Sequence, residues 1–246
     1  MAVRNGAATI EGALHSIAQQ TFSDWELIVI DGASTDGTLA LLEQHHANIA
    51  TMVSEPDSGI YDAMNKGIAH ARGEWLLFLN SDDYLYNADV FNTIFTENDL
   101  STVDFVYGNE LIVNPRNGAQ MLFSKQFKSF SDLFMGKAMR HQSSLFRRAL
   151  FTRLGGYDSS FQLVGDREWM ARCFNDGSVR INYINTTITV FKRGGASESN
   201  PLLRTREKLR VARKYFPPFF VIIHQIRLLL WECYAYIKKG YRRGCD

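Results

Sequence analysis

The chain has 246 residues, of which 46% are hydrophobic and 13% aromatic. This length and composition suit one large α/β domain or two small ones, and they exclude an intrinsically disordered chain. The net charge of +1 hides an asymmetry. Residues 1–200 carry 16 Lys and Arg against 23 Asp and Glu, a net of −7, whereas residues 201–246 carry 11 against 3, a net of +8. We therefore expect a domain at 1–200 followed by a basic helical tail at 201–246.

In the first half of the chain, segments with helical spacing alternate with short apolar segments typical of strands. The predicted helices cover 10–20, 38–46 and 59–71, and the predicted strands cover 25–31, 49–54 and 75–80. This alternation favours βαβ units and a mostly parallel sheet flanked by helices. In the second half, the pattern predicts strands at 103–107, 111–113, 142–146 and 181–191 and a helix at 165–175.

The tail is mostly apolar from Phe219 to Ile237, but four polar or charged residues interrupt it and basic residues follow it. This pattern favours a helix lying in a membrane surface over a helix that spans the membrane. A helix packed on the protein's own core, with a solvated basic end, fits the pattern equally well.

The three cysteines lie far apart without a CxxC pair, so they suggest neither a structural zinc site nor a disulfide framework. A reducing, cytoplasmic setting fits this usage. Residues 1–5 are too few to hold the apolar segment of a signal peptide. We expect no nucleic-acid partner.

Two predicted strands end in carboxylates. The 75–80 strand is apolar along most of its length, as in a strand buried on both faces within a parallel sheet, and Asp82 and Asp83 follow it. Asp31 ends the 25–31 strand. Ligands of open α/β sheets bind outside the carboxyl ends of strands, and paired aspartates tolerate a phosphate when Mg²⁺ or Mn²⁺ lies between them. Aspartates at a strand end also form turns and helix N-caps, but the three together favour a ligand site.

Six segments, in their order along the chain, resemble the family 2 glycosyltransferases, most closely the bacterial exopolysaccharide and colanic-acid-type enzymes. They are VIDGASTDGT (29–38), SEPDSGIYDAMNKG (54–67), GEWLLFLNSDD (73–83), HQSSLF (141–146), GGYD (155–158) and VGDREWMAR (164–172). The similarity covers most of residues 1–200. It implies a GT-A fold, a nucleotide-sugar donor such as a UDP-sugar, and an inverting transfer of one sugar to a hydroxyl.

The resemblance also implies a donor site with a divalent metal, Mn²⁺ or Mg²⁺. Asp31 would meet the base, Asp82 the ribose and the metal, and Asp83 the metal and the diphosphate. Asp57 and Lys66 are further candidates for the nucleotide pocket. Lys192 to Ser197 combine cations with glycines, as in a loop that closes over phosphates or in an exposed turn.

On the acceptor side, Asp166 matches the family's general base, and His141 could contact the diphosphate or the acceptor. A carboxylate takes the proton of the attacking hydroxyl in an inverting displacement, and an aspartate with its ordinary pKa of about 4 is ionised for this task. Asp166 could instead cap the helix that begins beside it, and a lone histidine is more often a structural hydrogen-bonding residue.

Two positions depart from the family pattern. Only Ala2 and Val3 stand where the family has an apolar first strand, so we expect this strand to be missing or very short. Asn80 occupies a position where many relatives have an aspartate, which leaves Asp82 and Asp83 to carry the metal. The QxxRW motif of the processive polymerases is absent from the sequence, which implies the addition of a single sugar.

The predicted function is the transfer of one sugar from a nucleotide-sugar to a saccharide or lipid-linked acceptor during cell-surface polysaccharide synthesis. The basic tail would hold the enzyme peripherally on the inner face of the cell membrane. A catalytically silent relative that serves as a scaffold subunit is the alternative. A glycosidase with two carboxylates is a third possibility, and it would need no metal.

Overall fold

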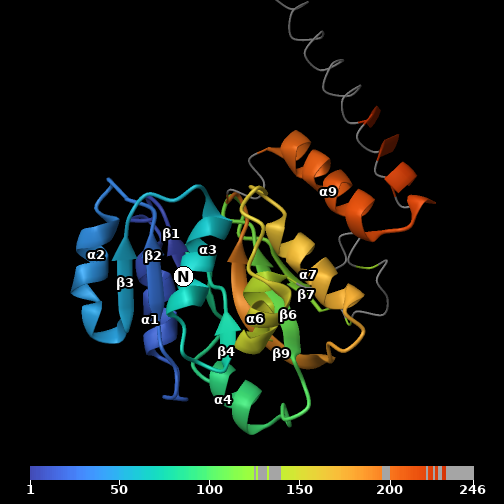
Figure 1. Cartoon of the computed structure of the whole chain (residues 1–246). Helices are drawn as coiled ribbons and strands as arrows, with labels where there is room; N and C mark the ends of the chain where they lie inside the picture. Colours follow the sequence, from blue (N-terminus) through green and yellow to red (C-terminus); the bar gives the residue numbers. More distant parts are fainter. Residues whose placement is uncertain are drawn as a thin grey trace, which may run out of the picture.

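The computed structural model describes residues 1–124, 126, 132, 140–195, 200–219, 221–223, 225, 226, 229 and 230 (Figure 1). Residues 231–246 of the predicted basic tail, and Ala196 and Ser197 of the predicted phosphate loop, lie outside the described residues. In the part that is described, no helix has both the length and the apolar character needed to cross a membrane.

The N-terminal half forms a three-stranded parallel sheet in the order β1 (Ala2–Val3), β2 (Ile28–Asp31), β3 (Thr51–Ser54). Its helices are α1 (Ile10–Ala18), α2 (Thr38–Gln44) and α3 (Ile60–His70), with a 3-10 turn, η1, at His46–Asn48. These elements confirm the predicted alternation to within three residues at each boundary. The first strand has two residues, and it pairs with β2 in the register Ala2 to Ile30 and Val3 to Asp31.

The second half forms a mixed sheet in the order β4 (Trp75–Leu77), β8 (Ser144–Arg147), β6 (Phe105–Val113), β9 (Ile181–Lys192), β5 (Tyr84–Leu85), and β7 (Gln120–Phe123) pairs with β6. Among the described strands of this sheet, β6 and β9 alone run parallel, and the other pairs are antiparallel. The expected parallel pairing therefore holds for the first sheet and not for the second.

Strand β4 joins the two sheets and corrects one expectation. It was expected within a parallel sheet, but it pairs antiparallel with β8, and its other side meets β1 through one parallel bridge between Ala2 and Asn80. Residues Trp75 to Leu77 are only partly buried, whereas Phe78 and Leu79 after them are buried. Apolar composition reports burial but not the direction of the neighbouring strand, so the sequence pattern could not distinguish the two arrangements.

Strand β6 replaces two predicted strands. The pairing of β6 with β9 shifts register around Gly108 and Asn109, which marks a bulge. A Cβ on Gly108 would lie 2.4 Å from the carbonyl oxygen of Thr186, so only glycine allows the two main chains to approach this closely. The apparent gap in the apolar pattern is therefore a bulge within one strand.

The remaining helices are α4 (Val90–Thr96), α6 (Arg148–Leu154), α7 (Gly165–Asn175) and α9 (Pro201–Tyr215), with a 3-10 turn, η2, at His141–Ser143. Figure 1 shows α9 next to α7, at the opposite side of the molecule from α2. Trp169 of α7 is fully buried, stacks on Phe151 with ring centres 4.1 Å apart, and donates through Nε1 to Gly155 O at 2.8 Å. This packing fixes the beginning of α7, where Asp166 lies.

Candidate active site

Asp31 and Asp57 come together at the carboxyl end of β2. Asp31 is fully buried, and its Oδ2 accepts hydrogen bonds from the Ser34 amide at 3.0 Å and the Ser54 hydroxyl at 2.7 Å. Its Oδ1 is buried without a hydrogen-bond partner among the described residues. A Cβ on Gly32 would lie 2.3 Å from Oδ2 of Asp57, so the Asp57 carboxylate lies against the turn that follows Asp31.

Lys66 lies near enough to Asp57 for the charge of that carboxylate to help raise the Lys66 pKa, but its direct contacts in the described structure are with other residues. Its ammonium lies 2.7 Å from the Glu55 carboxylate and donates to Pro56 O at 2.9 Å, and Asp62 lies 3.7 Å away. The hydrogen bond to Glu55 is the main reason that the pKa of Lys66 is raised. The structure therefore gives Lys66 a role in holding the loop before α3.

Asp82 and Asp83 follow β4 but occupy different environments. Asp83 is fully buried, and its oxygens accept from the Lys192 amide at 3.2 Å and from Asn80 Nδ2 at 3.1 Å. Burial and the neighbouring charge of Asp82 raise the pKa of Asp83 to about 7. Asp82 is partly exposed, and a Cβ on Gly195 would lie 2.9 Å from its Oδ2, so the segment after β9 lies beside it.

Asp166 and His141 form a pair at the start of α7. Nδ1 of His141 lies 3.0 Å from Oδ2 of Asp166, and the Tyr61 hydroxyl donates to Oδ1 at 3.2 Å. Burial alone would raise the pKa of Asp166, but the hydrogen bond and charge of His141 outweigh it and lower the pKa to about 2. The helix begins at Gly165 after Val164 without a side-chain cap, so Asp166 is not the N-cap of α7.

Sequence reasoning missed Glu110. This residue is fully buried in β6, and its Oε2 lies 3.0 Å from Nε of Arg140, although neither carboxylate oxygen makes a well-aligned hydrogen bond to a described residue. Burial raises the pKa of Glu110 to about 7, against the lowering effect of Arg140, and the charge of Asp83 raises it further. A glutamate inside the mostly apolar strand segment FVYGNELIV was the available signal.

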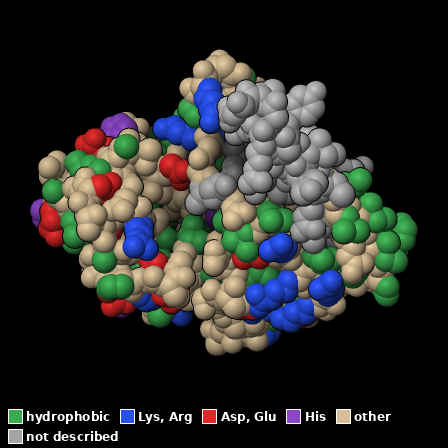
Figure 2. Space-filling view, turned by 90° about the horizontal axis from the view of Figure 1, so that it is seen from above, with side chains coloured by type: hydrophobic (Ala, Val, Ile, Leu, Met, Phe, Trp, Pro, Cys, Tyr) green, Lys and Arg blue, Asp and Glu red, His purple; other side chains and the backbone are tan. Residues whose placement is uncertain are grey.

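The geometry connects these groups across the carboxyl ends of the strands. The charge of His141 lowers the pKa of both Asp83 and Glu110, so the histidine that contacts Asp166 is also near enough to these two carboxylates to act on them. Its Nε2 is buried and has no hydrogen-bond partner within the described part of the chain. Acidic and basic side chains both occur on the face seen from above (Figure 2). Asp166 and Asp83 are therefore connected through His141, which contacts the first and acts electrostatically on the second.

The carboxylates of Asp82 and Asp83 could together bind a divalent cation. Among the described residues, no group of three or more His, Cys, Asp or Glu side chains is placed to hold an ion by itself. Mg²⁺ usually binds through one or two carboxylates and completes its shell with phosphate oxygens and waters. Asp82 and Asp83 supply that number of carboxylates, and a cation would relieve the repulsion that raises the pKa of Asp83.

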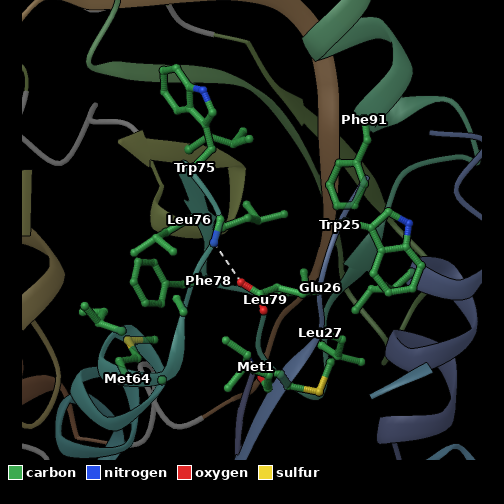
Figure 3. Close-up of a pocket in the computed structure, with 18 of the residues that line it drawn as sticks. Met1, Trp25, Glu26, Leu27, Met64, Trp75, Leu76, Phe78, Leu79 and Phe91 are labelled. Carbon is green, nitrogen blue, oxygen red and sulfur yellow. Dashed lines mark hydrogen bonds between the residues drawn. The ribbon is translucent and has the colours of Figure 1, made fainter. Parts of the chain in front are cut away.

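A separate, largely apolar cavity of about 350 Å³ lies between β2 and β4 (Figure 3). Trp25, Leu27, Trp75 and Phe91 are among the residues that line it. The Met1 amino group donates to Ile28 O at 2.7 Å, and its burial lowers the pKa of this group to about 5. None of the aspartates predicted for the site, Asp31, Asp57, Asp82, Asp83 and Asp166, lines this cavity.

Comparison with known proteins identifies the class. The sequence profile described as Glycosyl transferase family 2 matches residues 1–152, which is more than half of the chain. The chain therefore belongs to the family 2 glycosyltransferases.

Relatives by sequence support the same family. A PGL/p-HBAD biosynthesis glycosyltransferase of Mycobacterium tuberculosis (strain ATCC 25177 / H37Ra) is 33% identical over 204 residues, which cover 79% of this chain and 76% of the relative. The putative teichuronic acid biosynthesis glycosyltransferase TuaG of Bacillus subtilis (strain 168) is 38% identical over 82 residues, which cover 32% of each chain. These names do not test the colanic-acid-type assignment, which stays a prediction.

Solved structures confirm the GT-A fold. S. aureus TarS 1-349 in complex with UDP-GlcNAc matches with a TM-score of 0.69 and 19% identity, over 85% of this chain and 64% of that chain. The mannosyltransferase PcManGT from Pyrobaculum calidifontis, in complex with GDP-Man and Mn²⁺, matches with a TM-score of 0.63 and 22% identity, over 93% of this chain and 68% of that chain. The chain thus spans slightly less than two thirds of the TarS fragment.

Proposed function

We propose that this family 2 glycosyltransferase is a metal-dependent, inverting enzyme that moves one sugar from a UDP-sugar to a hydroxyl of a saccharide or lipid-linked acceptor in cell-surface polysaccharide synthesis. One observation carries the proposal most strongly. His141 contacts Asp166 and holds it as an ionised carboxylate, and the charge of the same histidine also acts on Asp83 after β4. An inverting displacement needs a base and a leaving-group site on opposite faces of the sugar.

The donor would bind at the ends of β2 and β4. The unpaired Oδ1 of Asp31 is a buried acceptor that an N–H group of the base would satisfy, and Asp57 lies beside the same turn. Asp82, which is partly exposed, would contact the ribose and the metal, and Asp83 would contact the metal and the diphosphate. When bound there by Asp82 and Asp83, a divalent ion stabilises the negative charge that develops on the departing diphosphate.

Asp166 would take the proton of the acceptor hydroxyl as that oxygen attacks the anomeric carbon. Its lowered pKa keeps it ionised at neutral pH, and the hydrogen bonds from Tyr61 and His141 fix its orientation. His141 Nε2 is buried without a hydrogen-bond partner among the described residues, and it would donate to the diphosphate or contact the acceptor. In this proposal, Asp166 holds the proton of the acceptor hydroxyl, and His141 and Tyr61 orient Asp166, independently of which sugar the donor carries.

Association with the membrane surface on the cytoplasmic side is part of the proposal. The segment after α9 exposes five large apolar side chains, Phe219, Ile222, Ile226, Leu229 and Leu230. Residues 201–246 carry a net charge of +8, which complements an anionic lipid surface. Buried Leu209, Val211 and Ala212 of α9 pack against the protein, so the apolar segment that follows would be the part that reaches the lipid.

Calorimetric titration of UDP with and without Mn²⁺ tests the proposal. We expect metal-dependent binding that Asp82→Asn weakens at least tenfold and that Asp166→Asn leaves unchanged. With UDP-sugars, release of UDP should be lost in Asp166→Asn while UDP still binds. The absence of UDP binding in either metal condition, with GDP and dTDP also inactive, would favour the silent scaffold. Metal-independent hydrolysis of a glycoside would favour the glycosidase.

A further inference from the structure

Strands β7, β6 and β9 are neighbours in the second sheet, and their register places three side chains in one row (Figure 1). Glu110 of β6 is paired with Phe123 of β7 on one side and with Thr189 of β9 on the other. Paired residues of adjacent strands direct their side chains to the same face of a sheet. Phe191 shares this face, because it follows Thr189 by two residues along β9.

Arg140, the residue directly before η2, is held by this row. Its Nε lies 3.0 Å from Oε2 of Glu110. Its guanidinium carbon lies over the rings of Phe123 and Phe191, at 5.4 and 5.3 Å from the ring centres. A guanidinium within about 6 Å of an aromatic ring centre gains a cation–π attraction. Contacts from three strands therefore fix the side chain of Arg140.

The turn η2 is fastened to this row at both ends. At one end, the carbonyl oxygen of Arg140 accepts a hydrogen bond from the Ser143 amide at 3.0 Å. At the other end, the hydroxyl groups of Ser143 and Thr189 are hydrogen-bonded at 2.5 Å. His141 lies between these two anchors, and its Nδ1 lies 3.0 Å from Oδ2 of Asp166. The position of the imidazole against Asp166 therefore depends on how η2 is held.

Stability does not explain why a glutamate holds Arg140. Glu110 is fully buried, and burying an ion pair costs desolvation free energy that the attraction between the charges often fails to offset. An apolar residue of similar size would suit the mostly apolar strand β6 without that cost. The side chain of Arg140 remains 37% exposed, so it needs no buried carboxylate to stay charged. The glutamate therefore points to a role in function.

We propose that Glu110 and Arg140 are a positioning pair for the transfer reaction, which fixes η2 and thereby holds His141 against the base Asp166. This inference rests on the proposed function and adds two residues to it. Both act through His141, so neither has to contact the donor or the acceptor. Loss of either side chain should let the imidazole move, and a displacement of about 1 Å near a reacting group can lower a rate about 100-fold.

Nitrogen NMR of the histidine rings tests the positioning directly and does not depend on activity. His141→Phe identifies the His141 signals, and Asp166→Ala gives their values when the carboxylate partner is lost. Methionine replaces either side chain with an uncharged, flexible one. We expect Glu110→Met and Arg140→Met to shift the His141 signals toward those in Asp166→Ala. Glu110→Gln should shift them less, because glutamine keeps an oxygen for Nε of Arg140.

Transfer kinetics measure the consequence for function. Each methionine variant should lower kcat, measured by UDP release, by at least about tenfold. The double variant should lie within about twofold of the slower single variant, because both changes break the same contact. The affinity for UDP, measured by calorimetry, should change by less than about threefold, since the pair acts on the base and not on the donor. Glu110→Gln should keep most of kcat.

Arg147→Met is the matched control. Arg147 ends β8, the strand into which η2 leads, and it therefore lies at the opposite end of this strand from η2. Its guanidinium carbon lies 4.7 Å from the ring centre of Trp75, and it forms an ion pair with Glu74. It is thus another arginine held by an aromatic ring and a glutamate. At a temperature at which it is folded, this variant should leave the His141 signals and kcat unchanged.

The outcomes separate the positioning pair from other roles. Unchanged His141 signals in both methionine variants, or an equal change in Arg147→Met, overturn the proposal. Weaker UDP binding with unchanged kcat also overturns it, because Glu110 would then act on the donor site through the charge of Asp83. If the chain shows no transfer, the NMR comparison still decides whether the pair fixes His141, although the proposed function has failed. If Arg140→Met does not fold, Glu110→Met decides alone, since it leaves a partly exposed cation and no buried charge.

Discussion

Nδ1 of His141 lies 3.0 Å from Oδ2 of Asp166, although the two residues are 25 positions apart and belong to different elements. The contact connects η2, which leads into β8, with the first turn of α7. It also reverses the effect of burial on Asp166, because burial alone would raise the pKa of this carboxyl and the histidine lowers it to about 2. The proposed base is therefore ionised at every pH at which the protein would normally work.

Replacing His141 should change the pH dependence of transfer. In His141→Phe, burial acts on Asp166 without the opposing hydrogen bond and charge, so the pKa of Asp166 should rise. Because the ionised carboxylate is the active form, the acid limb of the kcat profile should move to higher pH. We expect kcat at pH 7 to fall about 10- to 100-fold through lost orientation.

Tyr61→Phe provides the comparison for this experiment, because it removes the other donor to Asp166 and leaves the histidine in place. Its acid limb should move less than that of His141→Phe. Steady-state rates of UDP release between pH 4 and 8 would measure the acid limb of the kcat profile in each of the two variants. An unchanged profile in His141→Phe would contradict the role given to this contact.

Glu110→Gln should alter how stability depends on pH. The folded protein raises the pKa of Glu110 from 4.5 to about 7, so the proton favours folding, and this contribution is present below pH 4.5 and is lost as the pH rises through 7. Glutamine resembles the protonated carboxyl at every pH. The free energy of unfolding of the variant should equal that of the wild-type protein near pH 4.5 and should be larger at pH 8, by at most about 3 kcal/mol.

Urea unfolding at pH 4.5, 6 and 8 in EDTA would measure this difference. The pKa of the Met1 amino group is lowered to about 5, so this group makes the free energy of unfolding rise between pH 5 and 8. Both proteins contain this group, so its effect cancels when their stabilities are compared. Glu97→Gln, at an exposed position on the protein surface, serves as the control and should show no such trend. If the free energy of unfolding of Glu110→Gln and of the wild-type protein changes with pH in the same way, the raised pKa of Glu110 is wrong.

The helices and the parallel strands of the first sheet could be predicted from the sequence, because they depend on local pattern. Helix α7 was predicted at 165–175 and is observed at Gly165–Asn175, since its apolar spacing is regular. Asp31 and Asp82 were placed at one edge because parallel strands bring their carboxyl ends together. The parallel pairing of β1, β2 and β3 confirms the expected strand direction for Asp31, whereas Asp82 follows β4, which pairs antiparallel with β8.

The pairing partners in the second half could not be predicted, and they determine the rest of the site. The antiparallel pairing of β4 with β8 brings η2 close to the end of β4, and the parallel pairing of β6 with β9 brings Glu110 opposite Thr189. Neither relationship leaves a periodic signal in the sequence, since periodicity reports which face of a strand is buried and not which strand lies beside it. Glu110 and its ion pair with Arg140 were missed for this reason.

Two glycine substitutions should have opposite effects on stability. Gly67 lies inside α3, and an added Cβ would make an ordinary contact of 3.7 Å with Ile30, so Gly67→Ala should stabilise the fold by up to about 1 kcal/mol. In Gly108→Ala, the Cβ would lie 2.4 Å from Thr186 O and 2.9 Å from Ile188, which should destabilise the fold by about 1–3 kcal/mol. Thermal unfolding of the pair, made in the same background, would measure both changes. A neutral Gly108→Ala would show that the bulge in β6 can relax.

Glu207→Ala should lower turnover without weakening UDP binding. Its carboxylate is buried and accepts three backbone hydrogen bonds from residues 162–164, so its loss leaves these donors unpaired directly before α7. We expect a loss of stability of at least about 2 kcal/mol. Asp166 should lose its fixed position with the start of α7, whereas the donor residues on β2 and β4 should be unaffected.

Calorimetry with UDP and a UDP-release assay, both performed well below the unfolding temperature, separate the two effects. Glu207→Gln, which keeps one acceptor oxygen but brings an amide N–H toward a backbone donor, should be intermediate in both stability and kcat. If Glu207→Ala keeps full turnover, α9 does not position the base.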